Sequence, residues 1–259
     1  MNLKQKLDYH YKAFDKSQIS PDPLQFLHLY QDENDIEVIG FIASIFAYGN
    51  VKQIINSLDK ILLISNNHPY EFVINFKKKN YSSGLNNLKH RFYTDKDIIL
   101  FFLLLNKAVT EFGSLKNLFL KSYNSKEVNI KNALTKFSEY FISSAEEVSG
   151  GKISLGVKFM FPLPDLGSAC KRMNLFFRWM VRKDELDFGL WNEIPKNKLI
   201  MPVDTHVARI CKSLKLTTHK NVGWKMAEEI TQNLKKFDPE DPIKYDFAIC
   251  HIGMRKLNF

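Results

Sequence analysis

Apolar residues recur every three or four positions through most of this chain, and this spacing constrains the fold more than any other feature. Ile36, Ile39 and Ile42 begin one such series, and Phe46 ends it. Side chains at this spacing share one face of an α-helix and can be buried together. Because no convincing run of residues alternates between apolar and polar as in a half-buried strand, we predict an all-α fold.

Capping residues, glycines and prolines divide the periodic pattern into separate helices. We expect helices at 36–46, 51–65, 98–112, 114–119, 126–143, 168–183, 204–214, 222–236 and 241–253, with a short one opening at 68–69. Asp204, Asn221 and Asp241 stand where N-caps are expected. Segment 144–168 holds four Gly and two Pro without a sustained period, and therefore predicts an irregular connection.

The composition is that of a folded globular protein. Of 259 residues, 45% are hydrophobic and 25% are charged, which excludes disorder of the whole chain. The longest fully apolar run, 98–105, is far shorter than the roughly twenty residues that span a bilayer. Cys170, Cys211 and Cys250 are too few and too scattered for a disulfide framework or a four-thiolate metal site. We expect a soluble, cytoplasmic protein without a metal or other cofactor.

Positive charge is concentrated in the second part of the sequence. Residues 150–259 carry 19 Lys and Arg against 12 Asp and Glu, a net of +7, whereas residues 1–149 carry 18 against 16, a net of +2. A basic segment favours an anionic partner, and nucleic acid is the first candidate. A lysine-rich surface without a specific partner explains the charge equally well.

The segment 168–182 predicts a two-sided helix with one basic face. Lys171, Arg178 and Arg182 fall within about 40° of one another, opposite a face of apolar residues. Lys171 lies in the first turn, where the positive end of the helix dipole disfavours an ammonium and favours a nucleophilic amine. Lys171 is therefore a candidate nucleophile, and the alternative is a solvated face of a surface helix.

The string PVDTHVARI, at 202–210, places a carboxylate at the start of the next helix. Asp204 has a complete structural explanation as an N-cap, whose side chain accepts backbone N–H bonds. A carboxylate held in this way could also stabilise a cation that develops on a sugar. His206 and Arg209 are expected on the exposed side of the helix, where they could contact phosphates.

The order of these elements resembles the helix-hairpin-helix DNA glycosylase superfamily, the group of endonuclease III and 8-oxoguanine DNA glycosylase. In that superfamily a lysine follows a tight L-P-x-x-G hairpin, and an aspartate opens a helix in a V-D-x-H-type string. Leu163, Pro164 and Gly167 match the hairpin, while Lys171 and Asp204 match the lysine and the aspartate. The segment IEVIGFIASIFAYGNVKQI also resembles the superfamily's early helix and turn.

The sequence departs from the superfamily pattern at three points. Lys171 follows Gly167 by four residues rather than two. It precedes Asp204 by 33 residues, a spacing more similar to archaeal 8-oxoguanine glycosylases than to endonuclease III. The four closely spaced cysteines that hold the iron–sulfur cluster of endonuclease III are absent. The resemblance therefore indicates a separate bacterial branch without that cluster.

The resemblance implies two packed helical lobes with a hairpin-containing DNA-binding cleft between them. The expected lobes are 31–199, with the hairpin and Lys171, and 1–30 plus 200–259, with Asp204. The implied function is base-excision repair by a DNA glycosylase with AP lyase activity, which removes an oxidised purine such as 8-oxoguanine from duplex DNA. Lys171 would attack C1′ and Asp204 would stabilise the sugar cation. We expect a monomer, with no membrane partner.

The resemblance also suggests which residues contact the nucleic acid. The expected DNA-binding set is Pro164, Gly167, Ser168, Arg172, Arg178, His206 and Arg209. Phe92 and His251 are candidates for a base pocket, for which surface packing and a satisfied core histidine are the alternatives. Two other functions stay open: a non-catalytic binder of distorted or single-stranded nucleic acid on the same fold, and a helical interaction protein with incidental charge.

Overall fold

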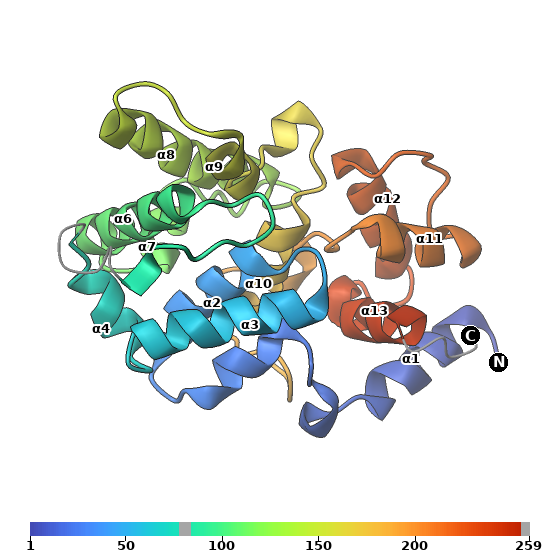
Figure 1. The fold of residues 1–259 in the computed structure, drawn as a ribbon. Coiled ribbons are helices and arrows are strands. Elements are labelled where there is room, and N and C mark those ends of the chain that lie inside the picture. The colour runs from blue at the N-terminus through green and yellow to red at the C-terminus, as the bar shows by residue number, and fades with distance from the viewer. Residues whose placement is uncertain (78–83, 255–259) are drawn as a thin grey trace. The chain divides into compact units, whose positions relative to one another are not determined.

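Among the residues that the computed structural model describes, 1–77 and 84–254, all regular secondary structure is helical (Figure 1). The only β-type pairings in this part are two isolated bridges, His90–Tyr93 and Lys183–Phe188. The predicted all-α fold is therefore confirmed. No helix in the described ranges combines the length and the apolar character needed to cross a membrane.

The chain forms two compact units, each assembled from more than one stretch of sequence. The first comprises Met1–Ile19, Ser125–Lys131 and Leu163–Phe259, and the second comprises Ser20–Asn124 and Asn132–Pro162. The lobe boundary expected near residue 200 thus falls inside the first unit. The reason is that segment 163–199 is tied to the C-terminal helices, for instance by the ion pair of Arg178 with Asp246. Both Lys171 and Asp204 belong to this first unit.

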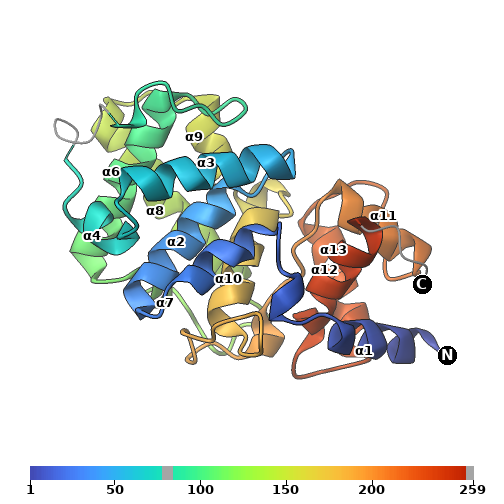
Figure 2. The same cartoon turned by 60° about the horizontal axis from the view of Figure 1, so that its bottom comes forward.

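The second unit is built around α2 (Glu33–Phe46), which is buried at every position from Ile36 onward. A helix that is apolar all round has no solvent face and becomes the centre of a core. Figure 2 shows α2 beside α3 (Val51–Ile64), which it contacts. The Phe41 ring packs against those of Phe101, Phe137 and Phe141. The other helices of this unit are α4 (Pro69–Ile74), α6 (Asp95–Phe112), α7 (Leu115–Leu120), α8 (Lys131–Ser149) and α9 (Leu155–Met160).

The first unit contains the helices that carry the candidate site. They are α1 (Leu3–Ala13), α10 (Lys171–Val181), α11 (Thr205–Ser213), α12 (Trp224–Lys235) and α13 (Asp246–Met254). Helix α13 packs against both α1 and α11, as both ribbon views show. Helix α10 is buried at every position from Arg172 to Val181, which excludes the alternative of a solvated basic face at Arg178.

Capping side chains fix the starts of three helices, and the N-cap predicted at Asp204 is confirmed. Thr94, Ser114 and Asp204 each accept a hydrogen bond from a backbone N–H in the first turn of the helix that follows. Gly113 ends α6 in the left-handed conformation, with φ of 79°. The Asp204 cap could be predicted because a cap is a local interaction between residues two or three positions apart.

Other predicted boundaries are wrong. Helix α12 begins at Trp224 with Gly223 at its N-cap, so Asn221 does not cap it. The Asp241 side chain caps no helix, because Arg182 binds this carboxylate instead. The segment 144–168, predicted to be irregular, contains the end of α8 and the whole of α9. Helix α1 was not predicted from the sequence, although Asn2 and Gln5 form a capping box at its start.

Candidate active site

Asp204 occupies the N-cap of α11 in an extended conformation. One of its carboxylate oxygens, Oδ1, accepts hydrogen bonds from the backbone N–H groups of His206 and Val207, both at 2.9 Å. The buried side chains of Val203 and Val207 anchor the chain on either side of this cap. The two bonds to Oδ1 fix the carboxylate and leave the second oxygen, Oδ2, available for another group.

Lys171 is the first residue of α10. The preceding residue, Cys170, has a left-handed backbone with φ of 46°, which turns the chain sharply into the helix. Burial raises the pKa of the Cys170 thiol to about 12. The thiol is therefore protonated at neutral pH, and the amine of Lys171 is the group with nucleophilic potential at this helix end.

The structure brings these two residues together across 33 positions of sequence. The Lys171 Nζ lies 3.7 Å from Asp204 Oδ2, and the side chains are 27% and 39% exposed. An ion pair this exposed contributes at most about 1 kcal/mol to stability, because solvent screens it and both side chains lose freedom. Its significance is chemical, since a substrate can reach an amine that lies beside a fixed carboxylate.

A tight turn precedes Lys171 and forms the segment matched to the hairpin. Residues Pro164–Leu166 make one 3₁₀ turn, and Gly167 follows with φ of 84°, a conformation that favours glycine. Leu166 lies at this turn with 82% of its surface exposed. Ser168 is part-exposed, and its hydroxyl accepts a hydrogen bond from the Cys170 N–H at 3.2 Å.

Two contacts that the sequence analysis missed hold this turn in place. The Gly167 carbonyl accepts a hydrogen bond from the Trp224 backbone N–H at 3.0 Å, at the start of α12. A Cβ on Gly223 would lie only 2.8 Å from the same carbonyl oxygen, so glycine permits this close approach. The Asn174 amide also donates to the Ala169 carbonyl at 3.0 Å. The Gly223–Trp224 pair at the start of α12 was the available sequence signal.

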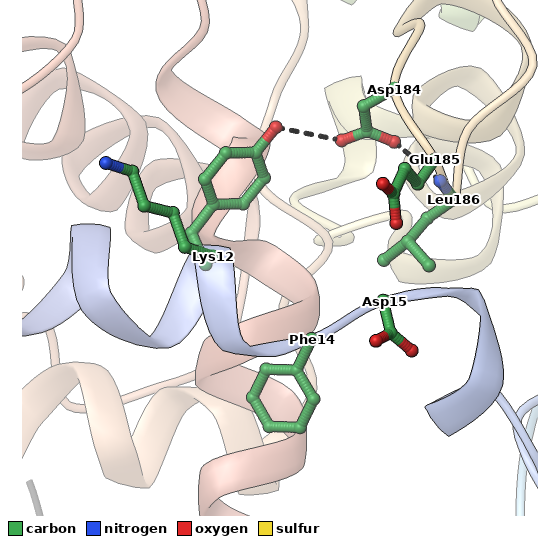
Figure 3. Close-up of a pocket in the computed structure, with 7 residues that line it drawn as sticks. Lys12, Phe14, Asp15, Asp184, Glu185 and Leu186 are labelled. Atoms are coloured by element: carbon green, nitrogen blue, oxygen red, sulfur yellow. Dashed lines mark hydrogen bonds between the residues drawn. The ribbon is translucent and has the colours of Figure 1, made fainter.

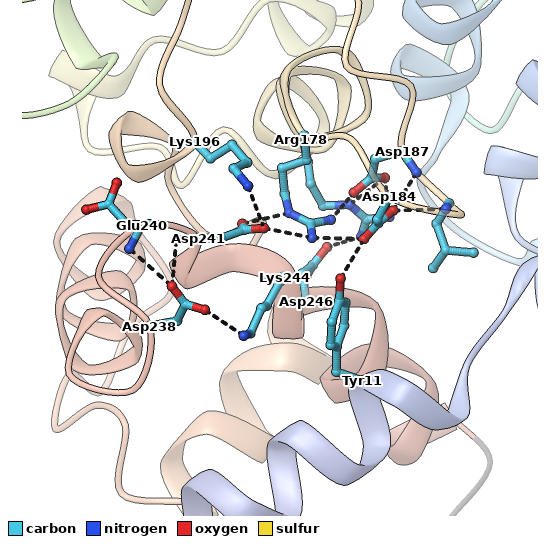
Figure 4. Close-up of polar contacts among 12 residues, drawn as sticks. Tyr11, Arg178, Asp184, Asp187, Lys196, Asp238, Glu240, Asp241, Lys244 and Asp246 are labelled. Carbon is cyan, nitrogen blue, oxygen red and sulfur yellow. Dashed lines mark hydrogen bonds and ion pairs between the residues drawn. The ribbon is translucent and has the colours of Figure 1, made fainter. Parts of the chain in front are cut away.

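Two arginines expected to contact DNA are buried instead. Arg172 and Arg178 are only 5% and 3% exposed, so neither presents a guanidinium to a phosphate at the surface. Arg178 pairs with Asp187 and Asp246 (Figure 4). Arg182 pairs with Asp187 and Asp241. Burial alone would lower the pKa of Arg178, but its carboxylate partners raise it above the ordinary value. The predicted DNA-binding role of both residues is therefore wrong.

The remaining predicted site residues have different environments. The Arg209 side chain is exposed, and its Nη2 lies 3.3 Å from His206 Nδ1. The other ring nitrogen of His206, Nε2, is buried without a hydrogen-bond partner among the described residues. Phe92 belongs to the second unit, is 48% exposed, and packs edge-on against Phe159. His251 lies in α13, but its side chain falls outside the described part of the chain.

A cavity of about 430 Å³ in the first unit has a largely acidic wall (Figure 3). Asp15, Asp184 and Glu185 line it, and the Tyr11 hydroxyl donates a hydrogen bond to Asp184 at 3.1 Å. Burial, with Asp184 nearby, raises the pKa of Tyr11 to about 12, so the hydroxyl stays protonated at neutral pH. Asp184 also accepts a hydrogen bond from Arg182, which makes this wall the edge of the buried ion-pair network.

The chemistry available at the first unit's surface is therefore that of an amine and a carboxylate. Within the described residues, no group of three or more His, Cys, Asp or Glu side chains is arranged to hold a metal ion. Lys171 can form a carbon–nitrogen bond, and Asp204 can stabilise positive charge that develops beside it.

Comparison with known proteins assigns the chain to one family. The family model described as "Protein of unknown function (DUF2400)" matches residues 22–255, and the chain belongs to this family. The matched range includes the turn before Lys171, Lys171 itself and Asp204. No curated protein matches the chain, and no solved structure does.

Proposed function

We propose that this protein is a DNA base-excision glycosylase with an associated AP lyase activity. The observation that carries the proposal is the approach of Lys171 Nζ to Asp204 Oδ2, at 3.7 Å, on the surface of a basic helical unit. The order of turn, lysine and capping aspartate supports the proposal through the superfamily resemblance. The substrate that this resemblance favours is an oxidised purine such as 8-oxoguanine in duplex DNA.

The proposed reaction requires that the damaged nucleotide leave the base stack, because the sugar carbon C1′ is inaccessible within it. The Lys171 amine, after loss of its proton, forms a bond to C1′ as the bond from C1′ to the base breaks. The bonding electron pair leaves with the base, which takes up a proton. Asp204 stabilises the positive charge that develops on the sugar, and this interaction is strongest in the transition state.

The lyase step follows from the covalent intermediate. Opening of the sugar ring converts the amine adduct into a Schiff base. The Schiff base acidifies the neighbouring C2′ proton, and its loss permits elimination of the 3′ phosphate. Water then hydrolyses the imine and releases Lys171. No redox partner is needed at any step.

Local structure supports these roles. Because Oδ1 of Asp204 is held by two backbone N–H groups, Oδ2 can face the reacting sugar without a change of rotamer. The Gly167 turn, fixed by Trp224 and Gly223, could present backbone N–H groups to a DNA phosphate. The exposed Arg209, in the second turn of α11, could contact a further phosphate.

Base release under single-turnover conditions tests the proposal. Wild type and Lys171→Gln are compared on a duplex with one 8-oxoguanine, at enzyme concentrations above the dissociation constant. The proposal expects release by wild type and none by the variant, with similar affinity for the duplex. Lys225→Gln, an exposed lysine of α12, is the matched control. Equal release by wild type and Lys171→Gln would remove Lys171 from the mechanism.

The alternative is a protein that binds distorted or single-stranded nucleic acid without chemistry. The basic charge of segment 150–259 supports this function as well as the glycosylase. The two differ in what they require of Lys171 and Asp204, because a binder tolerates loss of either group.

A further inference from the structure

A second cavity in the first unit, of about 490 Å³, lies along the exposed side of α11. We call it the basic pocket, and it is lined by Thr205, Ala208, Arg209, Lys212, Lys220, Asn221 and Val222. The helix forms one wall, and the loop between α11 and α12 forms the other. The basic pocket begins at the residue next to Asp204.

The basic pocket contains three cationic side chains and no carboxylate. Among the described residues, Arg209, Lys212 and Lys220 form no ion pair with an acidic side chain. Other lysines of this unit do so, for example Lys131 with Asp165 and Lys244 with Asp238. Uncompensated cations that line one concavity raise the local concentration of anions. The basic pocket is therefore suited to an anionic ligand.

Hydrogen bonds hold these cations in position. The Lys212 Nζ donates to the Lys220 carbonyl at 2.7 Å, which ties the helix to the opposite wall. Arg209 is held against the ring of His206. The opposite face of α11 is buried through Val207, Ile210 and Cys211. Because the groups are already oriented, a ligand loses less binding energy in ordering them.

We propose that the basic pocket binds a backbone phosphate of the DNA strand on which Lys171 and Asp204 act, an inference that rests on the proposed function. Arg209 can bind two phosphate oxygens at once, and the ammonium groups can neutralise the charge. The Thr205 hydroxyl and the Asn221 amide add neutral donors. The apolar walls from Ala208 and Val222 suit contact with a deoxyribose.

The position of the basic pocket predicts which phosphate it binds. Arg209 and Lys212 follow Asp204 by five and eight residues, which is about 7.5 and 12 Å along a helix axis at about 1.5 Å per residue. Nucleotides of one strand rise by about 3.4 Å. Because successive phosphates of a strand lie at least this far apart, the bound phosphate is within about four nucleotides of the reacting one.

The salt dependence of binding tests this inference without any chemistry. The probe is a duplex with a tetrahydrofuran abasic analogue, which has no base to release. For each neutralised phosphate, the slope of log K against log salt changes by about 0.9. We expect Lys212→Gln with Lys220→Gln to reduce the slope by about this amount. The control Lys225→Gln keeps the wild-type slope, and an unchanged slope in the double variant overturns the inference.

Neutral phosphate analogues locate the contact. A methylphosphonate is placed singly at positions one to five on each side of the abasic analogue. We expect wild type and the double variant to bind equally well only when the substitution lies at one position, within about four nucleotides of the abasic analogue on one side. A difference that persists at every position refutes the assignment to a strand phosphate.

Two further experiments are needed. One distinguishes a strand phosphate from free phosphate as the ligand, and the other distinguishes failure of the basic-pocket inference from failure of the glycosylase proposal. If only wild type binds inorganic phosphate, while wild type and the double variant bind the abasic duplex equally at constant ionic strength, the basic pocket is a free-phosphate site and the inference is wrong. Lys171→Gln should keep the wild-type salt slope, because binding does not use the amine. If Lys171→Gln stays active while the double variant loses slope, the glycosylase mechanism fails and the phosphate site remains.

Discussion

Replacement of Asp204 separates its structural role from its proposed chemical role. Asn caps helices about as well as Asp, so Asp204→Asn should preserve the bonds from His206 and Val207 and lose only the charge. Asp204→Ala removes both the cap and the charge. Capping is local to the start of α11, whereas the charge pairs with Lys171 and, in the proposed mechanism, stabilises the reacting sugar.

The magnitudes follow from the contacts. Loss of the cap costs about 1 kcal/mol, and loss of a part-exposed ion pair adds at most about 1 kcal/mol. For a chain of this size, about 1 kcal/mol lowers Tm by roughly 2–4 °C. We therefore expect Asp204→Ala to lower Tm by about 2–8 °C and Asp204→Asn to lower it by less. Loss of a preoriented electrostatic stabiliser should slow the chemical step by about 10²–10³-fold in both variants.

The assay combines thermal unfolding with single-turnover release of 8-oxoguanine, and with strand cleavage at an abasic site. We expect the rates of Asp204→Asn and Asp204→Ala to fall together while their Tm values differ. A wild-type rate in Asp204→Asn would return Asp204 to a purely structural role. A rate loss in Asp204→Ala alone, in step with its lower Tm, would lead to the same conclusion.

Three further predictions concern the frame around the site. Asp187→Ala should lower the free energy of unfolding by about 3–5 kcal/mol in denaturant titrations, because two buried arginines lose their shared carboxylate partner. A loss below about 1 kcal/mol would show that these buried ion pairs do not stabilise the fold. The folded state raises the pKa of Tyr11 to about 12. The contribution of the Tyr11 hydroxyl to the free energy of unfolding is therefore complete below about pH 10 and is lost as pH rises toward about 12. The free energy of unfolding of wild type should fall over that pH window, and that of Tyr11→Phe should fall less. Parallel plots of this free energy against pH would show that Tyr11 is not the group responsible. Burial and the raised pKa of Cys170 predict that iodoacetamide labels it only after unfolding, and labelling of the folded protein would refute this.

Helix content and helix starts could be predicted from the sequence because they depend on neighbours within one or two turns. The spacing of Ile36, Ile39 and Ile42 was enough to place α2, and a capping side chain was enough to place Asp204 at the start of α11. The proximity of Lys171 and Asp204 followed from the superfamily resemblance alone, since no local rule connects residues 33 positions apart.

The environment of α10 could not be predicted in the same way. Helical periodicity shows that Lys171, Arg178 and Arg182 share a face, but not what that face contacts. Arg178 and Arg182 contact carboxylates that lie as far along the chain as Asp246. Long-range contacts of this kind convert an apparently solvated stripe into a buried network. The hydrogen bond that holds the Gly167 turn is also a long-range contact, because its donor is the Trp224 backbone N–H at the start of α12.

Borohydride trapping is the sharpest test of Lys171 as the nucleophile, because it captures an amine that is covalently bound to a sugar. Wild type, Lys171→Gln and the control Lys225→Gln are incubated with duplexes that carry 8-oxoguanine or an abasic site, and the adducts are resolved by denaturing electrophoresis. This mechanism predicts an adduct with wild type and with the control, and none with Lys171→Gln. Peptide mapping should place the crosslink at Lys171. Adducts of equal yield from wild type and Lys171→Gln, or none from any protein on either duplex, would contradict it.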